Sequence, residues 1–158
     1  MQYWLMKSEP SVFGIDDLAR CKGQTEPWDG VRNYQARNMM RDKMQVGDLA
    51  FFYHSNCEVP GIVGIMRIVR AGYPDPTAFD QKHRYYDPKS DPENPRWYLV
   101  DVQLKRRFAV TVPLTELRRH TRLVHMKILQ KGNRLSITPV TPAQWKFIVK
   151  LEANQCQL

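Results

Sequence analysis

The strongest constraint on the fold is a series of strand-like segments in the middle of the chain. Residues 48–55 (DLAFFYHS) and 62–70 (IVGIMRIVR) are rich in apolar β-branched and aromatic residues, and a Pro-Gly pair lies in the connection between them. Residues 97–105 (WYLVDVQLK) and 108–112 (FAVTV) alternate apolar and polar side chains on either side of a short basic turn. Each pair is typical of an antiparallel hairpin. The chain is therefore expected to build a mostly antiparallel sheet.

Helical patterns flank these strands. Residues 34–44 place apolar side chains on one helical face, and residues 141–151 open with a capping box formed by Thr141 and Gln144. Strands that do not alternate regularly with helices predict an α+β fold with a curved sheet of about five or six strands, closing into a small barrel. The length of 158 residues predicts a single domain, residues 1–158. The other expected elements are strands at 3–7 and 135–137, a loop leading into a short helix at 11–20, helices near 114–120 and 123–131, and a surface loop at 74–96.

The positive charge is concentrated in one part of the chain. Between Lys105 and Arg134 there are nine Lys or Arg and one acidic residue, so this segment carries the whole net charge of +8. A clustered excess of this kind indicates a polyanionic partner such as nucleic acid. The alternative is a solvated helix surface that only keeps the protein in solution.

Several classes of protein are disfavoured by what the sequence lacks. Three widely spaced cysteines form no disulfide framework, which predicts a reducing compartment and a cytoplasmic location. The N-terminus reads as mature protein without a targeting segment, and no apolar run approaches the roughly 18 residues of a membrane span. Neither a phosphate-binding loop nor a zinc-ligand pattern occurs. We expect a monomer with no metal, no cofactor and no membrane association.

The segment WDGVRNYQARN is unusually rich in large polar and aromatic side chains. Asn33 is well suited to cap a helix that begins at the next residue, and Trp28 could pack over the loop. Capping does not explain why Arg32, Tyr34 and Arg37 cluster there. A helix N-terminus attracts anions, and aromatic rings beside arginines suit a nucleobase and its phosphate. The segment is therefore expected to form one wall of a binding site.

Five motifs occur in a fixed order along the chain, namely YWLMKSEP, WDGVRNYQARN, FFYHSN, GIVGI and RLSITPVTPAQW. In this set the sequence resembles the EVE domain family of the PUA-like superfamily, over about residues 2–151. The resemblance implies a small pseudobarrel with surrounding helices, and a reader that takes a modified base into an aromatic pocket. The eukaryotic members carry a long N-terminal extension that this sequence lacks, so the resemblance implies a stand-alone protein of the bacterial type.

The resemblance also implies which residues form the site. Glu9 would suit a cytosine-type base, because a carboxylate accepts a hydrogen bond from an exocyclic amine. The expected ligand-binding residues are Lys7, Ser8, Glu9, Trp28, Arg32, Asn33, Tyr34, Tyr53, His54, Ser55, Trp97 and Ser136. The expected contacts to the nucleic-acid backbone are Arg37, Lys105, Arg106, Arg107, Arg118, Arg119 and Arg122.

The predicted function is therefore binding of DNA or RNA through a modified base, without catalysis. Two other functions stay open at the level of sequence. One is a hydrolase acting on modified nucleosides or bases, as in some ASCH relatives, with Lys7 and Glu9 as catalytic groups. The other is a protein-interaction module, which would show no salt-dependent binding of oligonucleotides.

Overall fold

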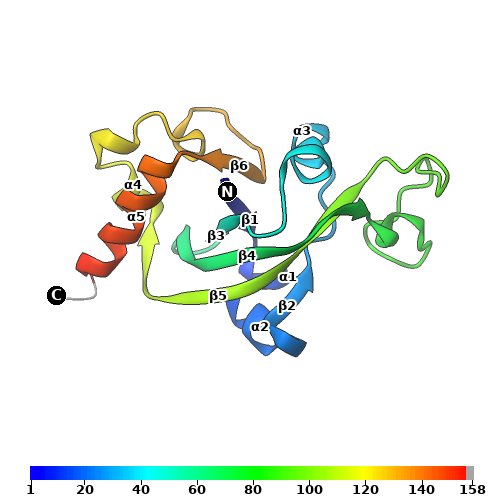
Figure 1. Cartoon of the computed structure of the whole chain (residues 1–158), viewed down its shortest axis with the longest axis horizontal. Coiled ribbons are helices and arrows are strands. Elements are labelled where there is room, and N and C mark those ends of the chain that lie inside the picture. The colour runs from blue at the N-terminus through cyan, green and yellow to red at the C-terminus, as the bar shows by residue number, and fades with distance from the viewer. Residues whose placement is uncertain (156–158) are drawn as a thin grey trace.

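The computed structural model describes residues 1–155 and contains one six-stranded sheet in the order β2-β5-β4-β3-β1-β6 (Figure 1). Neighbouring strands are antiparallel except β1 and β3, which are parallel. The strands are β1 (Tyr3–Ser8), β2 (Thr25–Pro27), β3 (Leu49–His54), β4 (Gly61–Pro74), β5 (Tyr98–Pro113) and β6 (Ile137–Val140). This arrangement confirms the predicted α+β class with a mostly antiparallel sheet and flanking helices.

The second predicted hairpin is wrong, because residues 98–112 belong to one long strand, β5. The basic residues that were expected to turn the chain instead stay in β5 and pair with β4, where Arg106 lies opposite Ile65 and Arg107 opposite Gly64. The stretch offers no Gly, Pro or Asn to form a tight turn. The pairing shifts its register at several points, and such bulges bend a strand without ending it.

The helices are short except the last one. They are α1 (Pro10–Phe13), α2 (Ile15–Arg20), α3 (Tyr34–Asn38), α4 (Leu114–Leu117) and α5 (Pro142–Gln155), with a π-helical turn at Met39–Lys43 after α3. The helices expected near 114–120 and 123–131 reduce to α4 and two short 3-10 turns, Thr121–Leu123 and Lys127–Leu129. The reason is the spacing of the buried residues Leu117, Leu123, Met126 and Ile128, which does not follow a helical period.

The sheet separates two hydrophobic cores, and successive residues of β1 point alternately into them. Trp4 and Met6 belong to the core that also contains Trp28, whereas Leu5 belongs to the core beneath α5. In the second core the ring of Trp145 stacks on Phe51 at 3.9 Å between centroids. These contacts hold α5 on one face of the sheet and leave the other face to the segments that follow β1 and β2 (Figure 1).

The predicted cap of α5 is confirmed. The backbone N–H of Gln144 donates to Oγ1 of Thr141 at 3.1 Å, and the backbone N–H of Thr141 donates to Oε1 of Gln144 at 3.0 Å. The predicted cap of α3 is confirmed as well, since Oδ1 of Asn33 accepts from the backbone N–H of Ala36 at 3.1 Å. Both caps satisfy backbone donors that the first helical turn leaves free.

Candidate functional site

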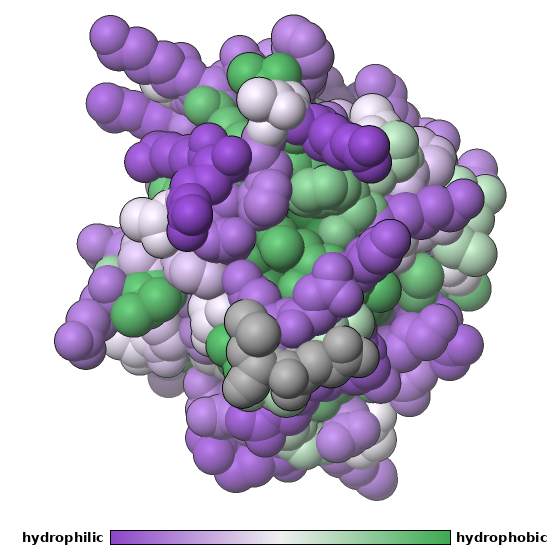
Figure 2. Space-filling model, turned by 90° about the vertical axis from the view of Figure 1, so that its left-hand side faces the viewer, coloured by the Kyte–Doolittle hydropathy of each residue, from purple (hydrophilic) through white to green (hydrophobic). Residues whose placement is uncertain are grey.

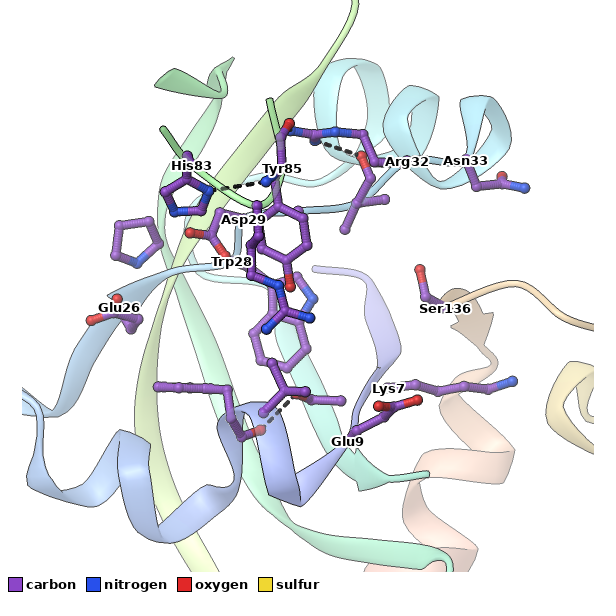
Figure 3. Close-up of a pocket in the computed structure, with 17 residues that line it drawn as sticks. Lys7, Glu9, Glu26, Trp28, Asp29, Arg32, Asn33, His83, Tyr85 and Ser136 are labelled. Atoms are coloured by element: carbon purple, nitrogen blue, oxygen red, sulfur yellow. Dashed lines mark hydrogen bonds between the residues drawn. The ribbon is translucent and has the colours of Figure 1, made fainter. Parts of the chain in front are cut away.

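A cavity of about 630 Å³ opens at the end of β1 (Figure 3). This volume falls within the roughly 300–1,000 Å³ typical of small-molecule sites. Its walls come from four parts of the chain: the residues around the end of β1, the segment after β2, the loop before β5, and Ser136 just before β6. The lining residues are Lys7, Ser8, Glu9, Val12, Phe13, Glu26, Pro27, Trp28, Asp29, Gly30, Val31, Arg32, Asn33, His83, Arg84, Tyr85 and Ser136.

Trp28 forms a rigid aromatic wall of this cavity. Its backbone N–H donates to the carbonyl of Val100 at 2.8 Å, which extends the pairing of β2 with β5. Its ring packs edge-to-face against Phe52 at 5.3 Å and is 7% exposed. The indole is therefore part of the core and offers only a small surface to a ligand.

The loop between β4 and β5 supplies another wall. Nη1 of Arg32 lies 3.1 Å from Oδ2 of the wholly buried Asp75, and Nη2 of Arg32 donates to the carbonyl of Tyr85 at 2.6 Å. The backbone N–H of Gly30 donates to the same Oδ2 at 3.1 Å. These bonds fasten the loop to the segment that carries Trp28, and they place the ring of Tyr85 in the lining.

Gly30 is a glycine because of Tyr85. Its φ of +76° lies in the left-handed region, and a Cβ at this position would overlap the Tyr85 ring.

In Figure 3 the rings of Trp28 and Tyr85 stand in the centre, with Asp29 and His83 on one side and Lys7, Glu9 and Ser136 on the other. An aromatic centre with polar groups around it suits a flat heterocycle that carries hydrogen-bonding edges.

Lys7, Ser8 and Glu9, at and just after the end of β1, line the cavity as expected. They differ in how far their polar groups are already engaged in hydrogen bonds within the protein. Ser8 donates its hydroxyl to the carbonyl of Phe13 at 2.6 Å, so its proton is already used. The exposed Glu9 accepts from Nδ2 of Asn56 at 3.2 Å. Lys7 is half-buried, and burial lowers the pKa of its ammonium below the ordinary value. Lys7 is therefore the cation that these three residues offer to a ligand.

Two of the expected aromatic residues lie outside the lining and stack on each other. Tyr34 is 51% exposed and stacks on Trp97 with 4.9 Å between ring centroids. Trp97 is buried, and its Nε1 donates to Oδ2 of Asp87 at 2.6 Å. Because α3 begins at Tyr34, this side chain turns away from the segment that lines the cavity. Both rings were expected in the lining of the cavity, and the structure places neither of them there.

The residues at the end of β3 also lie outside the lining. Tyr53 is buried in the core beneath α5, and burial raises the pKa of its hydroxyl to about 12. Nε2 of His54 accepts from the backbone N–H of Ile15 at 3.1 Å, and the backbone N–H of Ser55 donates to the carbonyl of Ser8 at 3.0 Å. This part of the FFYHSN motif supports the end of β1 instead of lining the cavity.

The list of expected ligand-binding residues lacked ten of the lining residues, among them Asp29, His83, Arg84 and Tyr85. Asp29 stands inside the WDG motif, and burial raises the pKa of its carboxyl above the ordinary value. His83, Arg84 and Tyr85 belong to the loop 74–96, whose closely spaced basic and aromatic residues were the available signal. The contact that brings this loop to the site joins Arg32 to a residue 43 positions away, which local patterns do not reveal.

Several arginines expected to contact the nucleic-acid backbone already have partners. Nη1 of Arg37 donates to the carbonyl of Arg96 at 2.7 Å. Arg106 is 3.1 Å from Glu152, Arg107 pairs with Asp16, and Arg119 is 3.3 Å from Glu116. The pair of Arg107 with Asp16 is exposed on both sides, so it is weak and can be exchanged for a phosphate contact, whereas Glu152 is buried. Lys105, Arg118 and Arg122 are exposed and form no ion pair with a carboxylate in the described part of the chain.

The basic segment lies away from the loop that closes the cavity. In Figure 1 residues 114–134 are beside α5, whereas the loop between β4 and β5 projects from the opposite side. On the α4 and α5 side, long hydrophilic side chains surround smaller hydrophobic areas (Figure 2). A nucleic acid that reached both places would have to run across the molecule.

Within residues 1–155 no three His, Cys, Asp or Glu side chains come together as metal ligands would. The same residues contain no helix that is both long and apolar enough to cross a membrane.

The sequence and the fold together define a class of protein. The chain belongs to the EVE domain family, whose model matches residues 2–151. This confirms the resemblance expected from the five motifs.

Its relatives include thymocyte nuclear protein 1. The Danio rerio protein is 46% identical, with 94% of this chain and 71% of that protein covered, and the Homo sapiens protein is 43% identical, with 97% and 75% covered. These relatives are named as nuclear proteins, which contradicts the prediction of a cytoplasmic location.

Solved structures share the fold closely. A crystal structure of a protein from Pseudomonas putida has a TM-score of 0.91 and 51% identity, with 95% of this chain and 99% of that chain covered. The crystal structure of human THYN1 in complex with DNA containing 5-methylcytosine has a TM-score of 0.90 and 45% identity, with 96% and 98% covered.

Proposed function

We propose that this protein binds DNA that carries a modified cytosine and holds the modified base in the cavity at the end of β1. The observation that carries the proposal is the combination of that cavity with the human relative crystallised with DNA containing 5-methylcytosine. The fold is shared at a TM-score of 0.90, so a site built on the same strands is expected at the same place. The partner is thus a nucleic acid, and binding of RNA stays a prediction.

The base would have to leave its stack to enter the cavity. Flipping a nucleotide costs a few kcal/mol, whereas stacking on an aromatic ring returns about 1–3 kcal/mol per base. Tyr85, which is partly exposed, supplies the main aromatic surface, and Trp28 adds the small exposed part of its ring. Arg84, which is exposed, and Lys7 supply positive charge for the neighbouring phosphates. Ser8, Glu9, Arg32, Asn33 and Ser136 complete the proposed site, with Arg32 acting by holding the loop in place.

Burial of a methyl group cannot by itself select a modified base. One methyl contributes about 0.8 kcal/mol on burial, which is roughly a fourfold preference. A stronger preference requires a shape that rejects other bases or hydrogen bonds that only the correct base completes. The polar lining around Trp28 and Tyr85 provides groups for such bonds.

The test compares three duplexes of one sequence that carry 5-methylcytosine, cytosine or thymine at a single position. The protein is titrated with each, alongside the variants Tyr85→Ala and Tyr86→Ala. Tyr85 lines the cavity, and its neighbour Tyr86 is an exposed tyrosine outside the lining, so Tyr86→Ala is the matched control. We expect tightest binding of the 5-methylcytosine duplex, and a loss of at least about tenfold in Tyr85→Ala only. Equal binding of all three duplexes by the unmodified protein would refute the proposal.

The hydrolase alternative is not favoured, because the human relative was crystallised with DNA that contains 5-methylcytosine. Lys7 and Glu9 line the same cavity, so the same duplex recovered after incubation provides a direct check. We expect it to be unchanged in mass. The protein-interaction alternative predicts no salt-dependent DNA binding and is tested by repeating the titration at several salt concentrations.

A further inference from the structure

The single helical turn α1 brings apolar side chains to the cavity. None of its four residues is buried, and both Val12 and Phe13 line the cavity. Phe13 packs in part against the core that contains Trp28, whereas Val12 is 43% exposed and belongs to neither core of the described chain. Valine is also a weak helix former. Neither core packing nor helix propensity therefore accounts for a valine at position 12.

Hydrogen bonds fix α1 at both of its ends. The hydroxyl of Ser8 donates to the carbonyl of Phe13 at 2.6 Å, and the backbone N–H of Phe13 donates to the carbonyl of Glu9 at 2.9 Å. Just after the turn, the backbone N–H of Ile15 donates to Nε2 of His54 at 3.1 Å. A wall that is held in this way is already ordered before a ligand arrives, so contact with it costs little conformational entropy.

The apolar part of the lining is small. Besides Val12 and Phe13 it consists of Pro27, Trp28 and Val31, and the last two are each only 7% exposed. Apart from one glycine and one tyrosine, the other lining residues carry polar or charged side chains. An apolar group that enters the cavity therefore finds accessible apolar side chains mainly at α1 and at Pro27.

Building on the proposed function, we propose that Val12 is the residue that recognises the methyl group of the modified base. The base lies with its C5 edge toward α1, and the methyl group packs against Val12 with Phe13 beside it. The other edge of the base, which carries the hydrogen-bonding groups, then faces the polar part of the lining. Apolar side chains recognise the methyl group of thymine in the DNA major groove by the same kind of contact.

This contact defines what Val12 distinguishes and what it does not. Burial of the methyl group gives about a fourfold preference for the methylated base, and covering the exposed surface of Val12 adds to it. Thymine carries the same methyl group, so Val12 separates methylated from unmethylated cytosine and does not separate 5-methylcytosine from thymine. That second distinction depends on the polar edge of the base.

The test uses the full chain and three substitutions. Val12→Thr keeps the branched shape but exchanges a methyl group for a hydroxyl, and Val12→Ala removes the contact without adding a polar group. Val46→Thr is the matched control, because Val46 is a 62% exposed valine in the turn before β3 and lies outside the lining. Exposed positions tolerate such changes, and thermal unfolding establishes that each variant is folded.

The measured quantities are the affinities for three duplexes of one sequence that carry cytosine, 5-methylcytosine or 5-hydroxymethylcytosine at a single position. In Val12→Thr the preference for 5-methylcytosine over cytosine should fall by at least about fourfold, because the methyl group would cover a hydroxyl without a partner. The same variant should gain at least about twofold for 5-hydroxymethylcytosine over 5-methylcytosine, because the two hydroxyls can form a hydrogen bond. Val12→Ala should lose part of the first preference without that gain. Val46→Thr should match the unmodified protein with all three duplexes.

Three results would overturn the role of Val12 and leave the proposed function intact. One is an unchanged preference for 5-methylcytosine over cytosine in Val12→Thr and Val12→Ala. Another is an equal loss of affinity for all three duplexes, which would indicate general damage to the cavity. The third is the absence of any gain for 5-hydroxymethylcytosine in Val12→Thr. If the unmodified protein itself bound all the duplexes equally, the proposed function would fail, and the inference with it.

Discussion

Arg32 and Asp75 form the contact that holds the two halves of the cavity together. Nη1 of Arg32 lies 3.1 Å from Oδ2 of Asp75, whose carboxylate is wholly buried. Asp75 also accepts from the backbone N–H of Thr77 and the N–H of Gly30, so one carboxylate organises the start of the loop and the segment after Trp28. The position of Tyr85 in the cavity wall therefore depends on the ion pair between Arg32 and Asp75, in addition to the contacts of the tyrosine ring.

Substitution of Arg32 by alanine should destabilise the protein by about 3 kcal/mol, because it leaves a buried carboxylate without its cation. The measurement is the free energy of unfolding from urea denaturation. Arg84→Ala is the control: this exposed neighbour makes no bond to Asp75, so its removal should change stability by less than about 0.5 kcal/mol. Equal stabilities of the two variants would show that the pair does not hold the loop.

Replacing Gly30 by alanine should displace Tyr85 from the cavity. The added Cβ would overlap the tyrosine ring and would also strain a backbone at φ +76°. Gly132→Ala separates the two effects, since Gly132 has a nearly identical φ of +77° but open space around the Cβ position. We expect about 1 kcal/mol of destabilisation at Gly132 and clearly more at Gly30. Only Gly30→Ala should weaken DNA binding, and comparable binding by both would contradict the role of Tyr85.

His54 should make stability fall at mildly acidic pH. Its Nε2 accepts a hydrogen bond from Ile15, and burial lowers the pKa of the ring below 6.5 in the folded state. Because the unfolded chain binds the proton more readily, the contribution of His54 to stability is complete above about pH 6.5 and is lost as pH falls through the lower folded pKa. Urea denaturation at several pH values should show a shallower pH dependence for His54→Asn.

The control for this effect is His125→Asn, which replaces an exposed histidine. Its stability should follow the pH dependence of the unmodified protein. The role of His54 would be disproved if both histidine variants gave the same curve.

Arg118 and Arg122 should contribute to DNA binding without regard to the base. Their joint replacement by alanine is expected to weaken binding of modified and unmodified duplexes alike. The slope of log affinity against log salt should become shallower by about 1 for each phosphate that an arginine no longer neutralises. Arg20 and Lys22, which lie on and just after α2, provide a double variant with the same change in charge. Weaker binding of the 5-methylcytosine duplex alone would mean that the arginines contact the base itself.

The sequence predicted those features that depend on neighbouring residues. Both helix caps, the strands β1, β3 and β4, and the contribution of WDGVRN to a cavity follow from patterns within about ten residues. The continuous strand β5 was missed, because its basic stretch is kept extended by pairing with β4 and not by its own composition. Tertiary pairing outweighs local preference in such cases.

The candidate site was predicted only in part for the same reason. Lys7, Trp28 and Arg32 line the cavity as expected, but Tyr85 reaches it through a contact between segments far apart in the chain. Tyr53 was expected in the lining because the resemblance to the EVE domain family implied it for the FFYHSN motif. Alternation along β3 instead turns its ring to the opposite face of the sheet from Phe52.

The most direct test of the central claim is a crystal structure of this protein with a short duplex that carries one 5-methylcytosine. The predicted result is the modified base outside the DNA stack and inside the cavity, against Trp28 and Tyr85. A base that remains stacked in the duplex, or that lies elsewhere on the protein while the cavity stays empty, would contradict it.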